Sequence, residues 1–203
     1  DFSGDYNYFF SQEDELMSVK VNHRRVVIQK YDAYELVERT VNRYNNLPKG
    51  STVVGVYQQD SSYYLFYSVY ESLKSRFKAR EIDFSKGVLL REEIVFEIDD
   101  KHKFGLFQSS EKSNSLVVFE EENTDVYKGG YCVLGQELVI ESKEVVLNNE
   151  PRTFCVSNAG AVAFVVTEFD PTVKDTKRNR DELKNYVTYC YLFSPTEERK
   201  TRL

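Results

Sequence analysis

The chain alternates between short apolar runs and polar turns along most of its length, and part of this alternation repeats. Three pairs of apolar runs recur about fifty residues apart, namely residues 54–58 with 63–67, 104–108 with 116–119, and 154–156 with 162–166. A polar turn separates the two runs of each pair, which is typical of a β-hairpin. Hairpins that recur at this spacing predict stacked sheet units of about four strands each.

The segment after the first three apolar runs has a different periodicity. Asp32 is followed three positions later by Glu35, which is the arrangement of a helix capping box. The apolar positions of this segment recur at the spacing of one helical face, at Tyr34, Val37, Val41 and Tyr44. We therefore predict one amphipathic helix over residues 32–46, which Pro48 and Gly50 would end.

Strand-like runs return at residue 51 and continue to about residue 170, with closely spaced turns between them. Residues 171–182 contain almost nothing apolar, so we predict a long exposed loop, with a marginal helix near residues 180–186. Residues 186–193 have the pattern of one more strand, and residues 195–203 are expected to form a polar tail.

These patterns favour a mainly β protein with antiparallel, propeller-like repeated sheet units of about fifty residues and one amphipathic helix. A β-sandwich or barrel with a packed helix is the alternative. We expect residues 1–203 to form a single β-rich domain, which would also fit a fragment of a larger propeller-like domain.

Composition supports this assignment and limits the classes of partner. The 203 residues include 15 Tyr and 14 Phe, which favour half-buried strands. The net charge of −6 makes the chain acidic and does not favour nucleic acid as a partner. No apolar run reaches the roughly 18 residues that a transmembrane helix needs, so we expect a soluble protein without a membrane span.

The sequence does not determine the cellular compartment of the protein. The chain starts at Asp1 and its only methionine is Met17, so we expect a processed or trimmed polypeptide. We expect three buried thiols at Cys132, Cys155 and Cys190, as in an intracellular protein, whereas one disulfide with a free thiol is the alternative. The localisation is therefore unknown, leaning intracellular, with secretion as the other reading.

No cluster of residues with the spacing of a catalytic or metal site stands out. The two histidines, His23 and His102, lie far apart in separate turns, and the three cysteines are not clustered. We therefore predict no catalytic residues, no metal and no cofactor, and we lean away from an enzyme.

A run of alternating cations is the main candidate for binding. Lys74, Arg76, Lys78 and Arg80 alternate with smaller or apolar residues, so on a strand they would form one row about 13 Å long. Such a row could bind an acidic or phosphorylated segment of another protein. The structural alternative is the exposed face of an outer strand, and residues 120–122 with Asp125 could supply acidic partners.

A cluster of aromatic residues in the same region predicts core packing rather than binding. It comprises Tyr57, Tyr63, Tyr64, Phe66, Tyr67 and Tyr70. Alternation sends Tyr64 and Phe66 to one face of a strand and Tyr63 and Tyr67 to the other, so both faces are apolar. This pattern predicts a strand buried between two layers.

The function that fits these observations best is protein–protein interaction. We expect a scaffold module that uses a rim of loops and the basic strand face. A ligand-binding barrel or sandwich would need a closed cavity lined by Tyr and Phe side chains. A hydrolase would need carboxylates that converge in a pocket.

Overall fold

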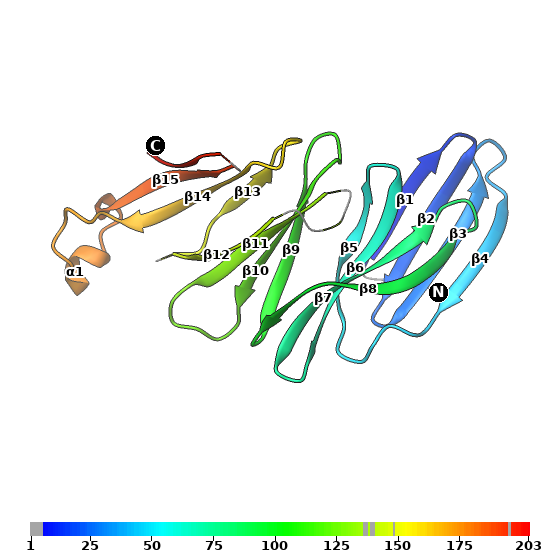
Figure 1. The fold of residues 1–203 in the computed structure, drawn as a ribbon, viewed down its shortest axis with the longest axis horizontal. Coiled ribbons are helices and arrows are strands. Elements are labelled where there is room, and N and C mark those ends of the chain that lie inside the picture. The colour runs from blue at the N-terminus through cyan, green and yellow to red at the C-terminus, as the bar shows by residue number, and fades with distance from the viewer. Residues whose placement is uncertain (1–5, 136–137, 139–140, 148, 195) are drawn as a thin grey trace. The chain divides into compact units, whose positions relative to one another are not determined.

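The computed structural model describes residues 6–135, 138, 141–147, 149–194 and 196–203. Its strands form four antiparallel sheets of four strands each, and every sheet follows the order of the chain (Figure 1). The residues divide into two compact units, Asp1–His102 and Lys103–Leu203, which are described separately. The prediction of four-stranded, propeller-like sheet units is confirmed.

The first unit contains two sheets. The strands of its first sheet are β1 Tyr6–Gln12, β2 Glu15–Asn22, β3 Arg25–Asp32 and β4 Glu38–Tyr44. Those of its second sheet are β5 Thr52–Gln59, β6 Ser62–Glu71, β7 Lys74–Asp83 and β8 Val88–Asp99. Neighbouring strands are joined by tight turns or short loops, so each sheet is an up-and-down meander.

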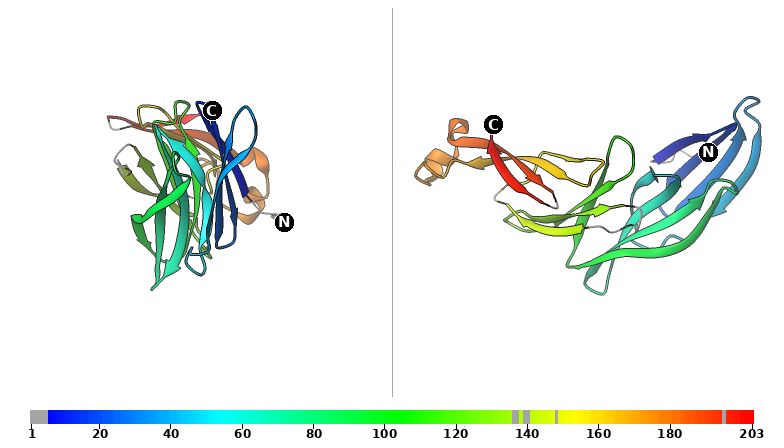
Figure 2. Two further views of the ribbon diagram at one scale, coloured as in Figure 1. Left: turned by 90° about the vertical axis from the view of Figure 1, so that its right-hand side faces the viewer. Right: turned by 45° about the horizontal axis from the view of Figure 1, so that its top comes forward.

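The second unit also contains two sheets. The strands of the first are β9 His102–Gln108, β10 Ser115–Glu121, β11 Lys128–Leu134 and β12 Glu141–Val146. Those of the second are β13 Thr153–Val156, β14 Val162–Phe169, β15 Tyr186–Phe193 and β16 Glu198–Arg202. Figure 2 shows the same ribbon from two further directions.

The repeating hairpins now have a common place in the fold. They are β5–β6, β9–β10 and β13–β14, and each is the first hairpin of its sheet. The hairpin β1–β2 has the same place in the remaining sheet. The repeat in the sequence therefore marks where each sheet begins.

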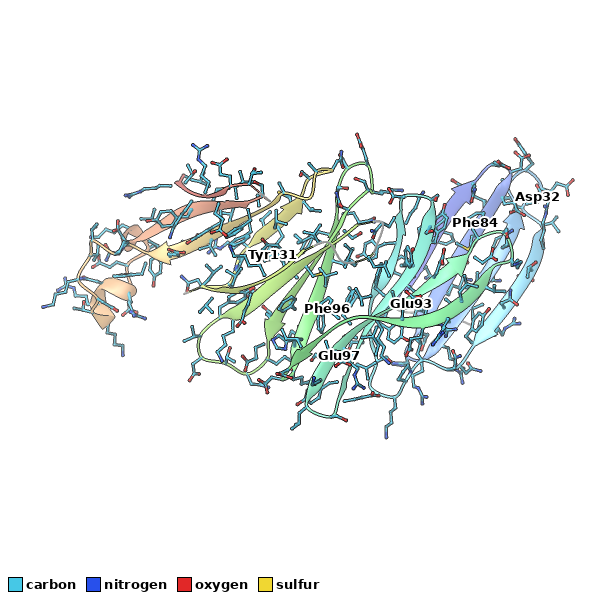
Figure 3. All side chains as sticks on the ribbon, viewed as in Figure 1. Asp32, Phe84, Glu93, Phe96, Glu97 and Tyr131 are labelled. Atoms are coloured by element: carbon cyan, nitrogen blue, oxygen red, sulfur yellow. The ribbon has the colours of Figure 1, made fainter. Side chains whose placement is uncertain are left out.

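The predicted helix over residues 32–46 is wrong, because this segment forms a turn followed by β4. The side chain of Asp32 does accept hydrogen bonds from the amides of Tyr34 and Glu35, at 2.9 and 3.0 Å. However, Leu36 has a φ of 53°, which ends the turn in the left-handed region. The following residues then pair with β3, so the capping contacts serve a hairpin turn (Asp32 is labelled in Figure 3).

The C-terminal region also differs from the prediction in two places. The predicted polar tail contains β16, which pairs antiparallel with β15 and completes the fourth sheet. The marginal helix expected near residues 180–186 is replaced by the short helix α1 Lys177–Arg180 and a 3₁₀ turn at Leu183–Asn185. Thr176 caps α1, because its hydroxyl accepts a hydrogen bond from the amide of Asn179. The strand predicted over residues 186–193 is confirmed as β15.

The core of the first unit lies between its two sheets. Its first sheet contributes aliphatic residues of β2 and β3, such as Met17 and Ile28, and its second contributes Leu65 and Tyr67 of β6. The opposite face of the second sheet carries a row of rings at Tyr57, Phe66, Phe77 and Phe96, with successive centroids 6.3, 5.6 and 5.3 Å apart (Phe96 is labelled in Figure 3). Both faces of β6 are therefore apolar, as the alternation predicted.

The second unit has its own core between its two sheets. Leu116, Tyr131 and Val133 come from the first of these sheets, and Phe164 and Val166 come from the second. Ring contacts extend this core, because Phe164 lies 5.5 Å from the ring centroids of both Phe154 and Phe193. None of the helices formed by the described residues has the length and apolar character needed to cross a bilayer.

Candidate functional site

The four cations singled out in the sequence all lie on β7. They alternate along the strand and are opposite Glu71, Val69, Tyr67 and Leu65 of β6 in turn. The expected row on one face of a strand is therefore present in the geometry. β7 is an inner strand, with β6 on one side and β8 on the other.

The first two cations are paired with carboxylates of neighbouring strands. The Nζ atom of Lys74 lies 3.6 Å from Glu97 and 3.9 Å from Asp99. Arg76 lies 2.7 Å from Glu97 and 3.1 Å from Glu71 (Glu97 is labelled in Figure 3). Arg76 and Lys74 lower the pKa of Glu97, mainly through the hydrogen bond from Arg76.

The last two cations differ in their surroundings. Lys78 is only 7% exposed, and its Nζ atom lies 2.8 Å from Glu92. Arg80 donates hydrogen bonds to the carbonyl of Leu90 at 3.0 Å and to the side chain of Asn46 at 3.2 Å. The row thus forms a ladder of internal contacts, in which Lys74, with 46% of its side chain exposed, is the most accessible member.

The acidic partners of this ladder differ from those considered in the sequence. They are Glu71, Glu92, Glu97 and Asp99. In the second unit, Glu120 and Glu121 pair instead with Lys103 and Lys128, at 3.7 and 3.2 Å. Sequence proximity could not reveal this, because the register between β7 and β8 decides which carboxylates meet the row.

Lys78, the buried member of the ladder, belongs to a hydrogen-bonded cluster of three side chains. The hydroxyl of Tyr67 and the ammonium of Lys78 both donate to the carboxylate of Glu92. Burial alone would raise the pKa of Glu92, but the hydrogen bonds from Lys78 and Tyr67 outweigh it and lower the pKa. Burial and the contact with Glu92 raise the pKa of Tyr67. The cluster therefore holds a carboxylate ionised beside a neutral phenol.

The same combination occurs in the last sheet of the second unit. Tyr191 donates to Glu168 at 2.5 Å, and Lys200 donates to the same carboxylate at 2.8 Å. The ammonium of Lys200 also lies 4.0 Å from the ring centroid of Tyr189. In both sheets the Tyr and Lys are directly opposite each other on neighbouring strands. Because the donors are used internally, these clusters connect strands rather than present free groups to a ligand.

A cleft in the second unit offers a surface that is still available to a partner. Its volume is about 360 Å³, and β9, β10 and the segment around residues 150–154 line it. Its aromatic lining residues are Phe104, Phe107, Phe119, Tyr127 and Phe154. The rings of Phe107 and Phe154 have centroids 5.7 Å apart and are inclined at 37°. Tyr127 and Phe154 also pack against the core, which fixes one wall of the cleft.

Four charged residues complete the lining of this cleft. Lys103 and Glu120 form the ion pair already described, and the side chain of Lys103 is 66% exposed. Glu150 and Arg152 are both exposed, and among the described residues neither side chain has an ion-pair partner. These two charges are therefore available to a ligand. Burial, followed by the charges of Glu120 and Glu150, raises the pKa of Tyr127 to about 12.

Two glycines, Gly105 and Gly130, leave space for neighbouring side chains in and beside the cleft. Gly105 lines the cleft on β9, where a methyl group would come within 3.2 Å of Val118. Gly130 on β11 leaves room for the ring of Phe119, because a Cβ atom there would lie 2.6 Å from the ring. The sequence patterns described above do not predict this cleft. The adjacent glycines in a strand-like run, close to Phe119 and Tyr127, were the available signal.

The three cysteines differ in their exposure to solvent. Cys132 is buried, Cys190 is partly buried and Cys155 is exposed, and all three are free thiols. The expectation of three buried thiols is therefore wrong for Cys155, which lies on the short strand β13. Among the described residues, His, Cys, Asp and Glu side chains do not gather in a group of three that could hold a metal ion.

Comparisons with known proteins identify the fold. No protein-family model matches the chain, and no curated protein sequence matches it significantly. The Dos1 propeller has a TM-score of 0.52 at 12% identity, over 98% of this chain and 59% of that chain. A luciferin-regenerating enzyme gives 0.49 at 11% identity over 98% and 60%, and Kuenenia stuttgartiensis hydrazine synthase gives 0.38 at 10% over 94% and 62%. The similarity to the Dos1 propeller shows a propeller-like fold, and the chain spans about 60% of the length of these structures.

Proposed function

We propose that this chain is a protein-interaction module in which the aromatic cleft binds a segment of a partner protein. The propeller-like sheets serve as its scaffold. The observation that carries the proposal is the cleft itself, where aromatic rings form the walls and Glu150 and Arg152 are free to pair with a ligand. Aromatic and arginine side chains are the residue types that contribute most strongly to protein interfaces.

The size and shape of the cleft favour a peptide segment. Its volume of about 360 Å³ is near the lower end of the range for small-molecule sites, so one or two side chains would fill it. Its lining comes from β9 and β10 of one sheet and from the segment that leads into β13 of the other, and both β9 and β13 are edge strands, so a longer chain could continue beyond it on either side. The charges at its rim could then pair with residues that flank the bound side chain.

The basic row is a second contact surface in this proposal, with Lys74 as its accessible end. An acidic or phosphorylated segment would have to compete with Glu97 and Asp99, which already lie near Lys74. Lys74→Glu is therefore the appropriate test variant, because Lys78 is too enclosed for a charge reversal to be informative. If a partner binds this row, Lys74→Glu weakens binding and reduces its dependence on salt.

The experiment is a selection of random-sequence peptides displayed on phage against the purified chain. Affinities of synthetic versions of the selected peptides are then measured for the Phe107→Ala and Phe9→Ala variants. Both rings are exposed, at 38% and 73%, but Phe9 lies in the first unit and serves as the matched control. We expect Phe107→Ala to weaken binding about tenfold and Phe9→Ala to leave it unchanged. Peptides that bind both variants like the native chain, or no selected peptides, would contradict the proposal.

A further inference from the structure

We infer that the cleft of the second unit selects a cationic side chain of its partner, a lysine ammonium or an arginine guanidinium. This inference rests on the proposed function, because it specifies the chemistry of the segment that the same cleft binds. Three observations support it: the aromatic walls, the position of two carboxylates and the greater exposure of Lys103 than of Glu120.

The aromatic walls can attract a cation through their π faces. The rings of Phe107 and Phe154 pack against each other with centroids 5.7 Å apart, Phe107 is 38% exposed, and Tyr127 lines the same cleft. A cation over such rings is attracted by their quadrupoles, and the attraction grows when the site is partly desolvated. The long apolar stems of lysine and arginine would contact the rings as well.

Two carboxylates add a negative potential to the same space. Glu150 lines the cleft, is exposed and has no ion-pair partner among the described residues. Glu120 has a loose contact with Lys103, whose Nζ atom lies 3.7 Å away. A cationic ligand could therefore pair with Glu150 directly and share Glu120 with Lys103.

The phenol of Tyr127 interacts with both of these carboxylates. After burial, the charges that raise its pKa are those of Glu120 and Glu150. Both carboxylates therefore act on this part of the cleft, whose lining also contains Lys103 and Arg152. A cation bound beside Glu120 and Glu150 would be stabilised by their charges.

The two lining cations restrict the ligand further. The side chain of Lys103 is 66% exposed, whereas that of its partner Glu120 is 32% exposed, so the carboxylate is the more enclosed of the pair. Arg152 is exposed as well. A ligand with several adjacent cations would meet repulsion there. A single cation with an acidic neighbour fits better, because the acid could pair with Arg152 while the cation contacts the exposed part of the Phe107 ring.

The test uses the peptides selected on phage against the full chain. In each selected peptide that depends on Phe107, the lysine or arginine is replaced by norleucine, which keeps an apolar stem without charge. We expect a loss of affinity of roughly threefold to thirtyfold, the range of cation–π and charge contacts. On the protein side, Phe107→Leu keeps apolar volume but removes the π face, and Glu150→Gln removes one charge, so each should weaken binding of cationic peptides.

A control variant away from the cleft shows whether an effect is specific to the cleft, and different outcomes would contradict the cation inference and the proposed function. Glu144→Gln alters an exposed glutamate on β12 that does not line the cleft, and it should leave the affinity unchanged. Phe107-dependent peptides without lysine or arginine, or with full affinity after the norleucine replacement, would overturn the cation inference and leave the proposed function standing. The lack of any Phe107-dependent peptide would overturn both.

Discussion

Lys78 lies directly opposite Tyr67 on the paired strands β7 and β6, and both side chains donate hydrogen bonds to the carboxylate of Glu92 on β8. One carboxylate thus connects three strands of one sheet. The arrangement explains how a lysine can be buried on a core-facing side of a sheet, because its charge is paired and hydrogen-bonded.

We expect Lys78→Ala to destabilise the first unit by about 2 kcal/mol or more, because the carboxylate of Glu92 would lose its ion-pair partner. The loss should be smaller than that for a fully buried pair, since the side chain of Glu92 is partly exposed. Lys74→Ala, which removes an exposed contact, should cost less than about 1 kcal/mol. Urea unfolding followed by circular dichroism measures both values, and equal losses would contradict the distinction.

The carboxyl of Asp83 should make stability depend on pH under acidic conditions. Hydrogen bonds from the side chain of Ser85 and the amide of Lys86 lower the pKa of Asp83 from 3.8 to about 2. Because the folded pKa lies below the unfolded one, the stabilisation is complete above pH 3.8 and is lost as the pH falls towards about 2. Asp83→Asn should remove this part of the acid dependence, as measured by denaturant unfolding at several pH values. An unchanged slope would show that these hydrogen bonds do not persist in solution.

The three thiols should differ in reactivity in the native protein. Cys155 is exposed, whereas burial raises the pKa of Cys132 to about 12. Because the thiolate is the reactive form, Cys155 should be alkylated first and Cys132 only after the second unit opens. Mass spectrometry after timed treatment with iodoacetamide locates the modified residues. Early modification of Cys132 would be inconsistent with its position in the core.

Gly130→Ala should destabilise the second unit by about 1–3 kcal/mol, because the added methyl group would overpack β11. Its Cβ atom would lie 2.5 Å from the carbonyl oxygen of Lys143 and 2.6 Å from the ring of Phe119. The matched control is Gly105→Ala, where the nearest contact is 3.2 Å to a methyl group of Val118 that can shift. Thermal and urea unfolding should therefore rank Gly130→Ala well below Gly105→Ala.

Much of the fold follows from local sequence patterns, and the errors have physical causes. The alternation in β6 correctly placed Tyr63 and Tyr67 on one face and Phe66 on the other, because side chains of a strand alternate strictly. The helix over residues 32–46 was wrong because Asp32 makes the same hydrogen bonds in a turn as at a helix start. The final strand was missed because β16 is exposed along its length and has no apolar alternation.

The binding surfaces could be predicted only in part. The row on β7 follows from residue spacing within one strand, but its acidic partners depend on pairing between strands. The cleft joins Phe107 with Phe154, which are far apart in sequence and meet through the packing of two sheets. No local sequence pattern predicts a contact between residues so far apart. Gly130 is the one local indication, because it leaves space for the ring of Phe119. Whether either surface binds a partner stays a prediction.

The two Tyr–Glu–Lys clusters have a consequence for folding fidelity. A chain with several similar hairpins risks joining strands of the wrong repeats, as repeat proteins do when they misassemble. A slip of one residue in the strand that carries the lysine would move it to the opposite face of the sheet and leave the glutamate without its ammonium partner. We therefore expect each cluster to favour the native strand pairing of its sheet, because only the correct neighbours in the correct register bring its three side chains together.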